Sequence, residues 1–132
     1  MQKIAILGVF TASIVTCSMA FAQELSGFWQ QIDDKTGSPK ALIEIKTQAD
    51  GSYTGNIHKV TPRPGYTPRE KCIKCPPPYT DKPILGLEII KGLKPTSKNN
   101  YGHGQILDPL TGKIYDLKGR ISANGKRLTL RG

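Results

Sequence analysis

Cysteine, histidine and aromatic residues are scarce in this chain. Its 132 residues include three cysteines, two histidines and 7% aromatic residues. This composition excludes a dense disulfide scaffold and a surface of stacked aromatic rings of the kind that binds nucleic acids, and the length excludes a multidomain enzyme. With one Cys-x-x-Cys pair and so few histidines, neither a metal centre nor a cofactor site is predicted. We therefore expect one small domain with no nucleic-acid partner.

Long apolar runs are absent except at the N-terminus. Residues 1–3 include a lysine, residues 4–15 form an apolar run, and Ala20-Phe21-Ala22 follows it. This order is typical of a secretory signal peptide over residues 1–22, so we expect cleavage near Ala22 and a mature domain over residues 23–132 that is periplasmic or secreted. The run is shorter than the roughly 20 residues of a membrane-spanning helix, so no transmembrane segment is predicted.

Acidic residues are outnumbered by basic ones. Ten Asp and Glu stand against 19 Lys and Arg, which gives a formal net charge of +9. An exported protein does not meet the chromosome, so the expected counter-charges are lipid headgroups, acidic polysaccharide or acidic proteins. Peripheral contact with an anionic envelope surface is therefore predicted.

Hydrophobic and polar side chains alternate along several short runs with the two-residue period of a β-strand. No amphipathic helix separates these runs, and Asp50-Gly51 and Asn124-Gly125 are dipeptides that favour tight turns between antiparallel strands. The pattern predicts an all-β fold, a small antiparallel up-and-down β-barrel. About seven strands are expected, over residues 28–31, 41–46, 53–58, 85–89, 101–107, 115–121 and 128–131.

A barrel of about eight strands has an interior that side chains fill or that holds one small ligand. The alternation predicts which side chains point inward, and some of these are expected simply to fill the core. The candidates for the inner face and for contact with a ligand are Tyr53, Ile57, Leu85, Leu87, Ile89, Tyr115 and Leu117.

Residues 61–83 interrupt the strand pattern with seven of the chain's ten prolines. Proline cannot pair within a central strand, so this segment is predicted to be a long stiff loop, called the lid below. Cys72 and Cys75 lie within it, and a structural disulfide is the favoured interpretation in an oxidising compartment. A redox centre is a second interpretation, although the prolines after Cys75 leave no helix N-terminus to stabilise a thiolate. A metal site is a third, and it needs two further ligands.

Basic residues are concentrated in and beside the lid. Their charge would favour an anionic headgroup at the mouth of an apolar cavity, and the alternative is a loop kept soluble by its charge. The candidates for contact with a headgroup are Lys59, Arg63, Arg69, Lys71 and Lys74.

Two segments share the pattern Asp-x-x-Thr-Gly, at residues 33–37 and 108–112. Each has too few carboxylates for a calcium loop. Turn geometry is predicted instead, with the aspartate accepting backbone hydrogen bonds and the glycine taking a positive φ.

Gly27-x-Trp29 resembles the opening motif of lipocalins, in which the tryptophan closes one end of the barrel and an arginine from a late strand lies across its ring. The resemblance implies a structural role for Gly27 and Trp29. It also implies that Arg131 stacks on Trp29.

Six motifs, in the same order and spacing, resemble a bacterial exported family, the domain of unknown function 2147. The resemblance implies a secreted or periplasmic, lipocalin-like β-barrel and supplies no established reaction. Family members continue past the final Arg-Gly with another strand, so incomplete closure is expected here, and an unpaired last strand would allow self-association. The motifs are Ser26-Gly27-Phe28-Trp29, Asp33-Asp34-Lys35-Thr36-Gly37, Ala41-Leu42-Ile43-Glu44-Ile45, Cys72-Ile73-Lys74-Cys75-Pro76, Ile106-Leu107-Asp108-Pro109 with Gly112, and Leu130-Arg131-Gly132.

We therefore expect an exported, non-enzymatic, lipocalin-like protein that binds a small amphipathic or lipid-like ligand. No catalytic constellation is recognised, because no serine-elbow motif occurs and the neighbours Asp33 and Asp34 would point to opposite faces of a strand. The alternatives are an envelope module that binds an acidic polymer or a protein partner through the basic loop, and a thiol–disulfide redox protein.

Overall fold

The computed structural model describes residues 24–62, 65 and 68–132, so the predicted signal peptide and Arg63 lie outside the described residues. Within these ranges no helix is long and apolar enough to cross a membrane. The strands are β1 (Gly27–Ile32), β2 (Pro39–Thr47), β3 (Tyr53–Val60), β4 (Glu88–Ser97), β5 (Asn100–Leu107), β6 (Ile114–Ile121) and β7 (Leu128–Arg131).

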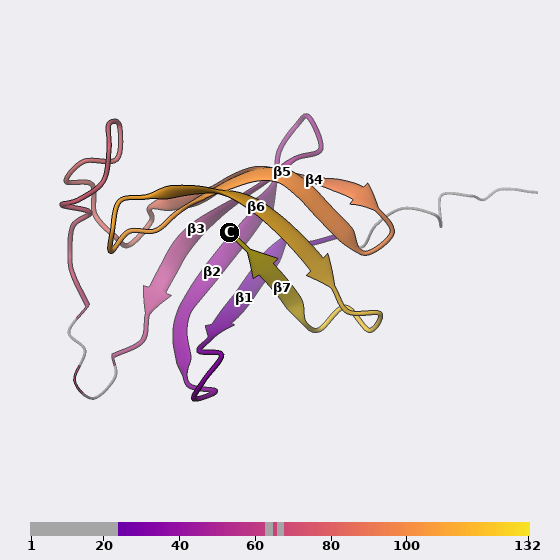
Figure 1. Ribbon diagram of the computed structural model, residues 1–132, viewed down its shortest axis with the longest axis horizontal. Coiled ribbons are helices and arrows are strands. Elements are labelled where there is room, and N and C mark those ends of the chain that lie inside the picture. Colours follow the sequence, from indigo (N-terminus) through magenta and orange to yellow (C-terminus); the bar gives the residue numbers. More distant parts are fainter. Residues whose placement is uncertain (1–23, 63–64, 66–67) are drawn as a thin grey trace, which may run out of the picture.

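The strands form one sheet in chain order, β1-β2-β3-β4-β5-β6-β7. Each strand is antiparallel to the next, and short connections join all successive strands except β3 and β4, which the lid separates. Figure 1 shows the sheet curving into an open half-barrel, with β1 and β7 as its two edges. No ladder joins these edges in the described part of the chain. The predicted all-β, up-and-down, incompletely closed barrel is therefore confirmed.

The start of β4 corrects the strand predicted over residues 85–89. Gly86 adopts a φ of 86°, which only glycine adopts readily, and its N–H donates to the Ile57 carbonyl at 2.7 Å. The Leu87 N–H donates to the Ile84 carbonyl at 3.1 Å and closes a turn. Ile84 and Leu87 are buried on either side, whereas Leu85 is 61% exposed. The inner-face prediction for Leu85 was therefore wrong, because a turn replaces the alternation there.

A β-bulge changes the facing of one basic side chain. The register between β1 and β2 shifts after Gln31, and the pairing passes from Ala41 to Pro39. Lys40 is the extra residue on β2, and bulges of this kind redirect side chains relative to simple alternation. The Lys40 carbonyl still accepts a hydrogen bond from the Thr61 N–H at 2.9 Å.

A second register shift lies between β2 and β3. Ile43 pairs with Ile57, while the preceding residue of β2, Leu42, pairs with Lys59. His58 is therefore the extra residue on β3. Beyond it Lys59 is exposed and Val60 is half-buried.

The two Asp-x-x-Thr-Gly segments form the predicted turns. Asp33 Oδ1 accepts hydrogen bonds from the N–H groups of Lys35 and Thr36, which hold the pKa of its carboxyl below the ordinary value. The Gly37 N–H returns to the Asp33 carbonyl at 2.9 Å, and the Gly112 N–H returns to the Asp108 carbonyl at 2.8 Å.

One end of the half-barrel is filled by side chains. Leu25 is fully buried there, and its backbone carbonyl accepts a hydrogen bond from the Trp29 indole N–H at 2.8 Å. Its N–H lies 3.4 Å from the Tyr53 hydroxyl, and the Tyr53 and Tyr101 rings meet edge to face with centroids 6.0 Å apart. Trp29 thus fastens the segment before β1 to the core.

The stacking of Arg131 on Trp29 implied by the lipocalin resemblance is wrong. Arg131 is exposed and pairs with Lys118 on β6, whereas Trp29 pairs with Ile43 on β2. Within the described residues the two strands are opposite edges of the sheet with no ladder between them, and no cation–π contact joins the guanidinium to the ring.

The described part of the lid is a compact hairpin. Lys71 bridges to Pro83, and the Ile84 N–H donates to the Glu70 carbonyl at 2.9 Å. The predicted disulfide joins Cys72 and Cys75, both of which are buried. The lid thus contributes two buried sulfurs to the hydrophobic core.

The lid packs on the turn between β5 and β6. A sulfur of the disulfide, Cys72 Sγ, lies 3.8 Å from the Pro109 carbonyl oxygen. Gly112 lies so close to the lid that a side chain there would collide with the Lys74 carbonyl. Gly112 is therefore needed both for its φ of 77° and for its lack of a side chain.

Candidate functional site

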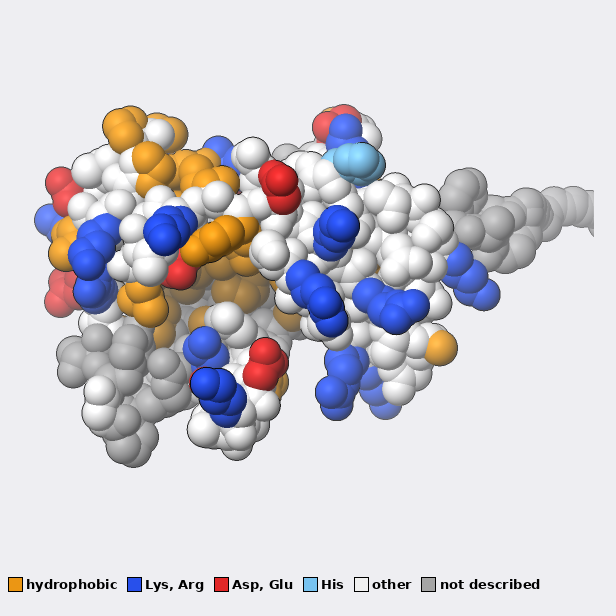
Figure 2. Space-filling model, in the orientation of Figure 1, with side chains coloured by type: hydrophobic (Ala, Val, Ile, Leu, Met, Phe, Trp, Pro, Cys, Tyr) orange, Lys and Arg blue, Asp and Glu red, His pale blue; other side chains and the backbone are white. Residues whose placement is uncertain are grey.

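The inner face of the half-barrel is hollowed into a cleft of about 470 Å³. Figure 2 shows hydrophobic side chains on the floor of this hollow. Branched aliphatic side chains on β2, β3 and β5 dominate the lining, because the inward positions of these strands carry isoleucine and leucine. The apolar wall includes Ala41, Ile43, Ile57, Val60, Ile106 and Leu107.

Loops border one end of the cleft, which is called the mouth below. Pro68 and Arg69 come from the lid, Ile84 follows it, and Pro109 and Leu110 belong to the turn between β5 and β6. Because the lid packs on that turn, the mouth is held by the backbone contacts between them.

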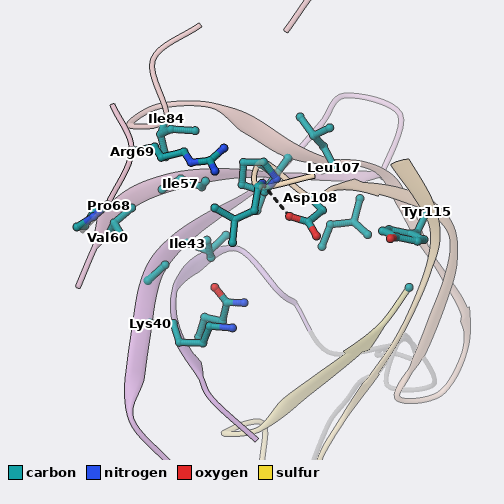
Figure 3. A pocket seen from close by; sticks show the side chains of 17 residues that line it. Lys40, Ile43, Ile57, Val60, Pro68, Arg69, Ile84, Leu107, Asp108 and Tyr115 are labelled. Atoms are coloured by element: carbon teal, nitrogen blue, oxygen red, sulfur yellow. Dashed lines mark hydrogen bonds between the residues drawn. The ribbon is translucent and has the colours of Figure 1, made fainter. Parts of the chain in front are cut away.

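Two basic side chains line the mainly apolar cleft. Lys40 comes from the bulge in β2, and Arg69 comes from the lid. Figure 3 places them on different sides of Ile43 and Ile57, so the apolar wall lies between two cations. Within the described residues neither cation has a salt-bridge partner.

Asp108 is the one carboxylate among the described lining residues. Its Oδ1 accepts a hydrogen bond from the Leu110 N–H at 2.9 Å, drawn as the dashed line in Figure 3. This bond holds the turn that carries Pro109 and Leu110. The carboxylate therefore shapes the mouth.

The predicted inner-face residues divide into three groups. Ile57, Ile89 and Tyr115 line the cleft, and Tyr115 remains 42% exposed. Buried elsewhere in the core are Tyr53, Leu87 and Leu117, and Leu85 lies outside, as described above.

The predicted headgroup residues are largely dispersed. Of the five, Arg69 lines the cleft. Lys59, Lys71 and Lys74 are exposed and are not part of the lining, and Arg63 falls outside the described residues.

Lys40 was missed by the sequence reasoning. Strict alternation with Ala41 and Ile43 predicts that Lys40 lies on the outer face. No residue pattern in the sequence predicts the bulge that turns Lys40 toward the cleft. The apolar residues Ile43, Val60, Ile84 and Ile106 were also left out of the candidate ligand contacts. For Ile43 the alternation itself was a sufficient signal.

The lid cysteines are joined in a disulfide, as the favoured interpretation predicted. In the described residues no group of three or more His, Cys, Asp or Glu gathers around them in a way that could hold a metal ion. The described lining of the cleft consists mainly of aliphatic side chains, with two cations, one carboxylate, the Gln31 amide and the Tyr115 ring.

Residues 27–132 match the family described as an uncharacterized protein conserved in bacteria, DUF2147. The chain belongs to this family. A search of the curated proteins found no match. Among solved structures the chain is similar to protein HP1028 from the human pathogen Helicobacter pylori, which is described as belonging to the lipocalin family. The TM-score is 0.65 at 19% identity, and the match covers 81% of this chain and 70% of that one.

The likeness to HP1028 extends over most of the described sheet and shows that the fold is lipocalin-like. A lipocalin-like fold is compatible with the binding of a small ligand inside the barrel. In this chain the cleft occupies that interior position.

Proposed function

We propose that this protein is an exported carrier that binds a small amphipathic anion, an alkyl chain with a carboxylate or similar head, in the half-barrel cleft. The observation that carries the proposal is the pair of basic side chains, Lys40 and Arg69, in a mainly aliphatic cleft with one carboxylate, Asp108, whose oxygen is hydrogen-bonded to the backbone of its own turn. The volume of about 470 Å³ falls within the range of about 300–1,000 Å³ that is typical of small-molecule sites.

The two parts of the lining favour the two parts of such a ligand. Each methylene group that leaves water for an aliphatic wall contributes about 0.8 kcal/mol, so an alkyl chain supplies most of the affinity. A negatively charged head attracts Lys40 or Arg69, whereas an uncharged head gains no such interaction. An anionic amphiphile is therefore preferred over a neutral one of equal length.

The composition of the cleft supports binding rather than catalysis. Its described lining contains no serine, threonine, cysteine or histidine. Asp108 is engaged with the turn backbone, so no pair of a nucleophile and an oriented base is assembled. The proposal is therefore a non-enzymatic one.

Export is part of the same proposal. The N-terminal pattern of residues 1–22 favours a cleavable signal peptide. A bacterial family and a disulfide between Cys72 and Cys75 are compatible with a periplasmic or secreted location, because thiols are readily oxidised outside the cytoplasm.

Displacement of a fluorescent fatty-acid analogue tests the proposal. Laurate is expected to compete more strongly than lauryl alcohol, which has the same chain and no charge. Lys40→Gln and Arg69→Gln are each expected to weaken laurate binding about tenfold, or about 1.4 kcal/mol, and to leave the alcohol unchanged. Lys126→Gln, in the exposed turn before β7, is the matched control and should bind like the unaltered protein.

Equal competition by laurate and lauryl alcohol, with no effect of either cleft substitution, would contradict the assignment of the two cations. Absence of saturable binding of the analogue itself would contradict the carrier proposal as a whole.

A further inference from the structure

Three aliphatic side chains are exposed on the lid, on the turn after it and on the turn between β5 and β6. Ile73 in the lid is 58% exposed, Leu85 after the lid is 61% exposed, and Leu110 in the turn between β5 and β6 is 44% exposed. Single exposed hydrophobic residues are ordinary on protein surfaces, whereas a group on neighbouring loops indicates an interaction surface. Figure 2 shows hydrophobic side chains at the left of the view, with both basic and acidic side chains beside them.

Backbone contacts place these loops together. The Cys72 N–H donates to the Lys82 carbonyl at 2.9 Å, so the two sides of the lid hairpin run next to each other. The Lys74 backbone touches Gly112, which joins the lid to the turn that carries Leu110. Ile73, Leu85 and Leu110 therefore belong to one end of the molecule.

The aliphatic side chains are held outward by the fold. Ile73 stands between Cys72 and Cys75, which are both buried and joined by the disulfide. Leu85 stands between the buried residues Ile84 and Leu87, in the turn closed by the hydrogen bond from the Leu87 N–H to the Ile84 carbonyl. Neither side chain can reach the core unless its buried neighbours leave it, so the exposure is built into the backbone.

Exposed lysines lie on the same loops and outnumber the exposed acidic residues of the lid, Glu70 and Asp81. Lys71, Lys74 and Lys82 belong to the lid, and Lys113 follows the turn between β5 and β6. These four lysines, with Ile73, Leu85 and Leu110, are called the loop surface below. A flexible aliphatic stem with a cationic end suits lysine to the boundary between an apolar layer and an anionic one.

We infer that the loop surface docks on a lipid bilayer that carries anionic headgroups. The aliphatic side chains enter the acyl boundary and the lysines contact the headgroups, a combination typical of peripheral membrane proteins. An acidic polysaccharide would satisfy the lysines alone and leave the aliphatic side chains in water, so a lipid surface fits the observations better. Leu110 also lines the cleft, so docking turns the mouth toward the bilayer.

Vesicle flotation of the exported, disulfide-bonded protein tests the inference. The protein is expected to float with vesicles of phosphatidylcholine and phosphatidylglycerol, less with phosphatidylcholine alone, and less as salt is raised. The double substitution Ile73→Ser with Leu85→Ser is expected to weaken binding to the mixed vesicles at least tenfold. Both positions are exposed, so thermal unfolding should remain close to that of the unaltered protein.

Phe28→Ser is the matched control. Phe28 is 55% exposed on β1, outside the loop surface, so its removal takes away a similar apolar area and should leave flotation unchanged. Equal flotation of the double variant and the unaltered protein would overturn the inference. Retention on an alginate matrix without any vesicle binding would overturn it in favour of an acidic polymer.

The inference does not depend on the cleft being occupied. The double variant is expected to keep the laurate affinity of the unaltered protein, because neither Ile73 nor Leu85 lines the cleft. Loss of laurate binding with normal flotation would contradict the carrier proposal alone, and the reverse result would contradict membrane docking alone.

Discussion

Gly37 and Gly112 close turns of the same sequence pattern in different surroundings. Their φ values are nearly equal, 74° and 77°. Around Gly37 nothing lies within reach of an added side chain, whereas at Gly112 the Lys74 carbonyl occupies that space. Substitution of Gly37 therefore measures the cost of the positive φ alone, and substitution of Gly112 adds the cost of a collision with the lid.

Alanine at each position tests this contact. Gly37→Ala is expected to lower the free energy of unfolding by about 1 kcal/mol, the cost of a positive φ for a residue with a side chain. Gly112→Ala is expected to cost at least about 2 kcal/mol more, because the lid or the turn must also move. Urea denaturation of the two variants measures the difference, and equal losses would contradict the packing of the lid on this turn.

Burial of Tyr101 predicts loss of stability at alkaline pH. Desolvation raises the pKa of its phenol from 10.0 to about 12, with a contribution from Tyr53. Between these values the unfolded chain has lost a proton that the folded protein retains, so stability falls as pH rises from 10 toward 12. Tyr101→Phe is expected to reduce this fall by about 2–3 kcal/mol in denaturation curves taken across that range. If Tyr101→Phe lost as much stability between pH 10 and 12 as the unaltered protein does, the raised pKa of the Tyr101 phenol would be contradicted.

Single residues show where alternation stops being informative. Ile57 and Tyr115 follow it into the cleft, as predicted. Leu85 does not, because a positive φ at Gly86 ends the alternation, and Lys40 does not, because a bulge shifts the register. Both exceptions depend on how the chain pairs or turns against other strands. The alternation of polar and apolar residues within one segment carries no information about such pairing.

At the scale of elements, the segment before β1 and the first strand close one end of the half-barrel together. Leu25 is fully buried and receives the Trp29 indole hydrogen bond. The resemblance to lipocalins located Trp29 correctly in the packed core and misplaced its partner, because Arg131 belongs to the opposite edge.

Trp29 and Arg131 are therefore expected to respond differently to substitution. Trp29→Phe removes the hydrogen bond to Leu25 and part of the packed ring, and should lower the free energy of unfolding by about 1–3 kcal/mol. Arg131→Ala should change it by less than about 0.5 kcal/mol, as for ordinary surface substitutions. Thermal or urea denaturation distinguishes the two, and a large effect of Arg131→Ala would restore the stacking that the resemblance implied.

Element order was largely readable from the sequence, since most strands have a clear period and two of the joining turns carry Asp50-Gly51 and Asn124-Gly125. The lid was recognised from its prolines, and its disulfide from export and cysteine spacing. Its packing on the turn between β5 and β6 was not, because a contact made by the backbone of Lys74 and the missing side chain of Gly112 leaves no hydrophobic signature.

At the scale of the whole molecule, the same open sheet forms both the cleft and the unpaired edge at β7. Residues of β1 to β6 line the cleft, and within the described residues β7 pairs with β6 alone. Self-association through this edge stays a prediction, because an exposed strand edge offers unpaired backbone groups to a second chain.

Native mass spectrometry of the protein purified from its own envelope, followed by solvent extraction, tests the central claim most directly. A carrier is expected to give an adduct of roughly a few hundred daltons, the mass of a ligand that fills a cleft of this size. The extract should contain an anionic amphiphile, and Lys40→Gln with Arg69→Gln should lose most of the adduct. An apo mass for the unaltered protein, together with no saturable binding of laurate, would contradict the claim.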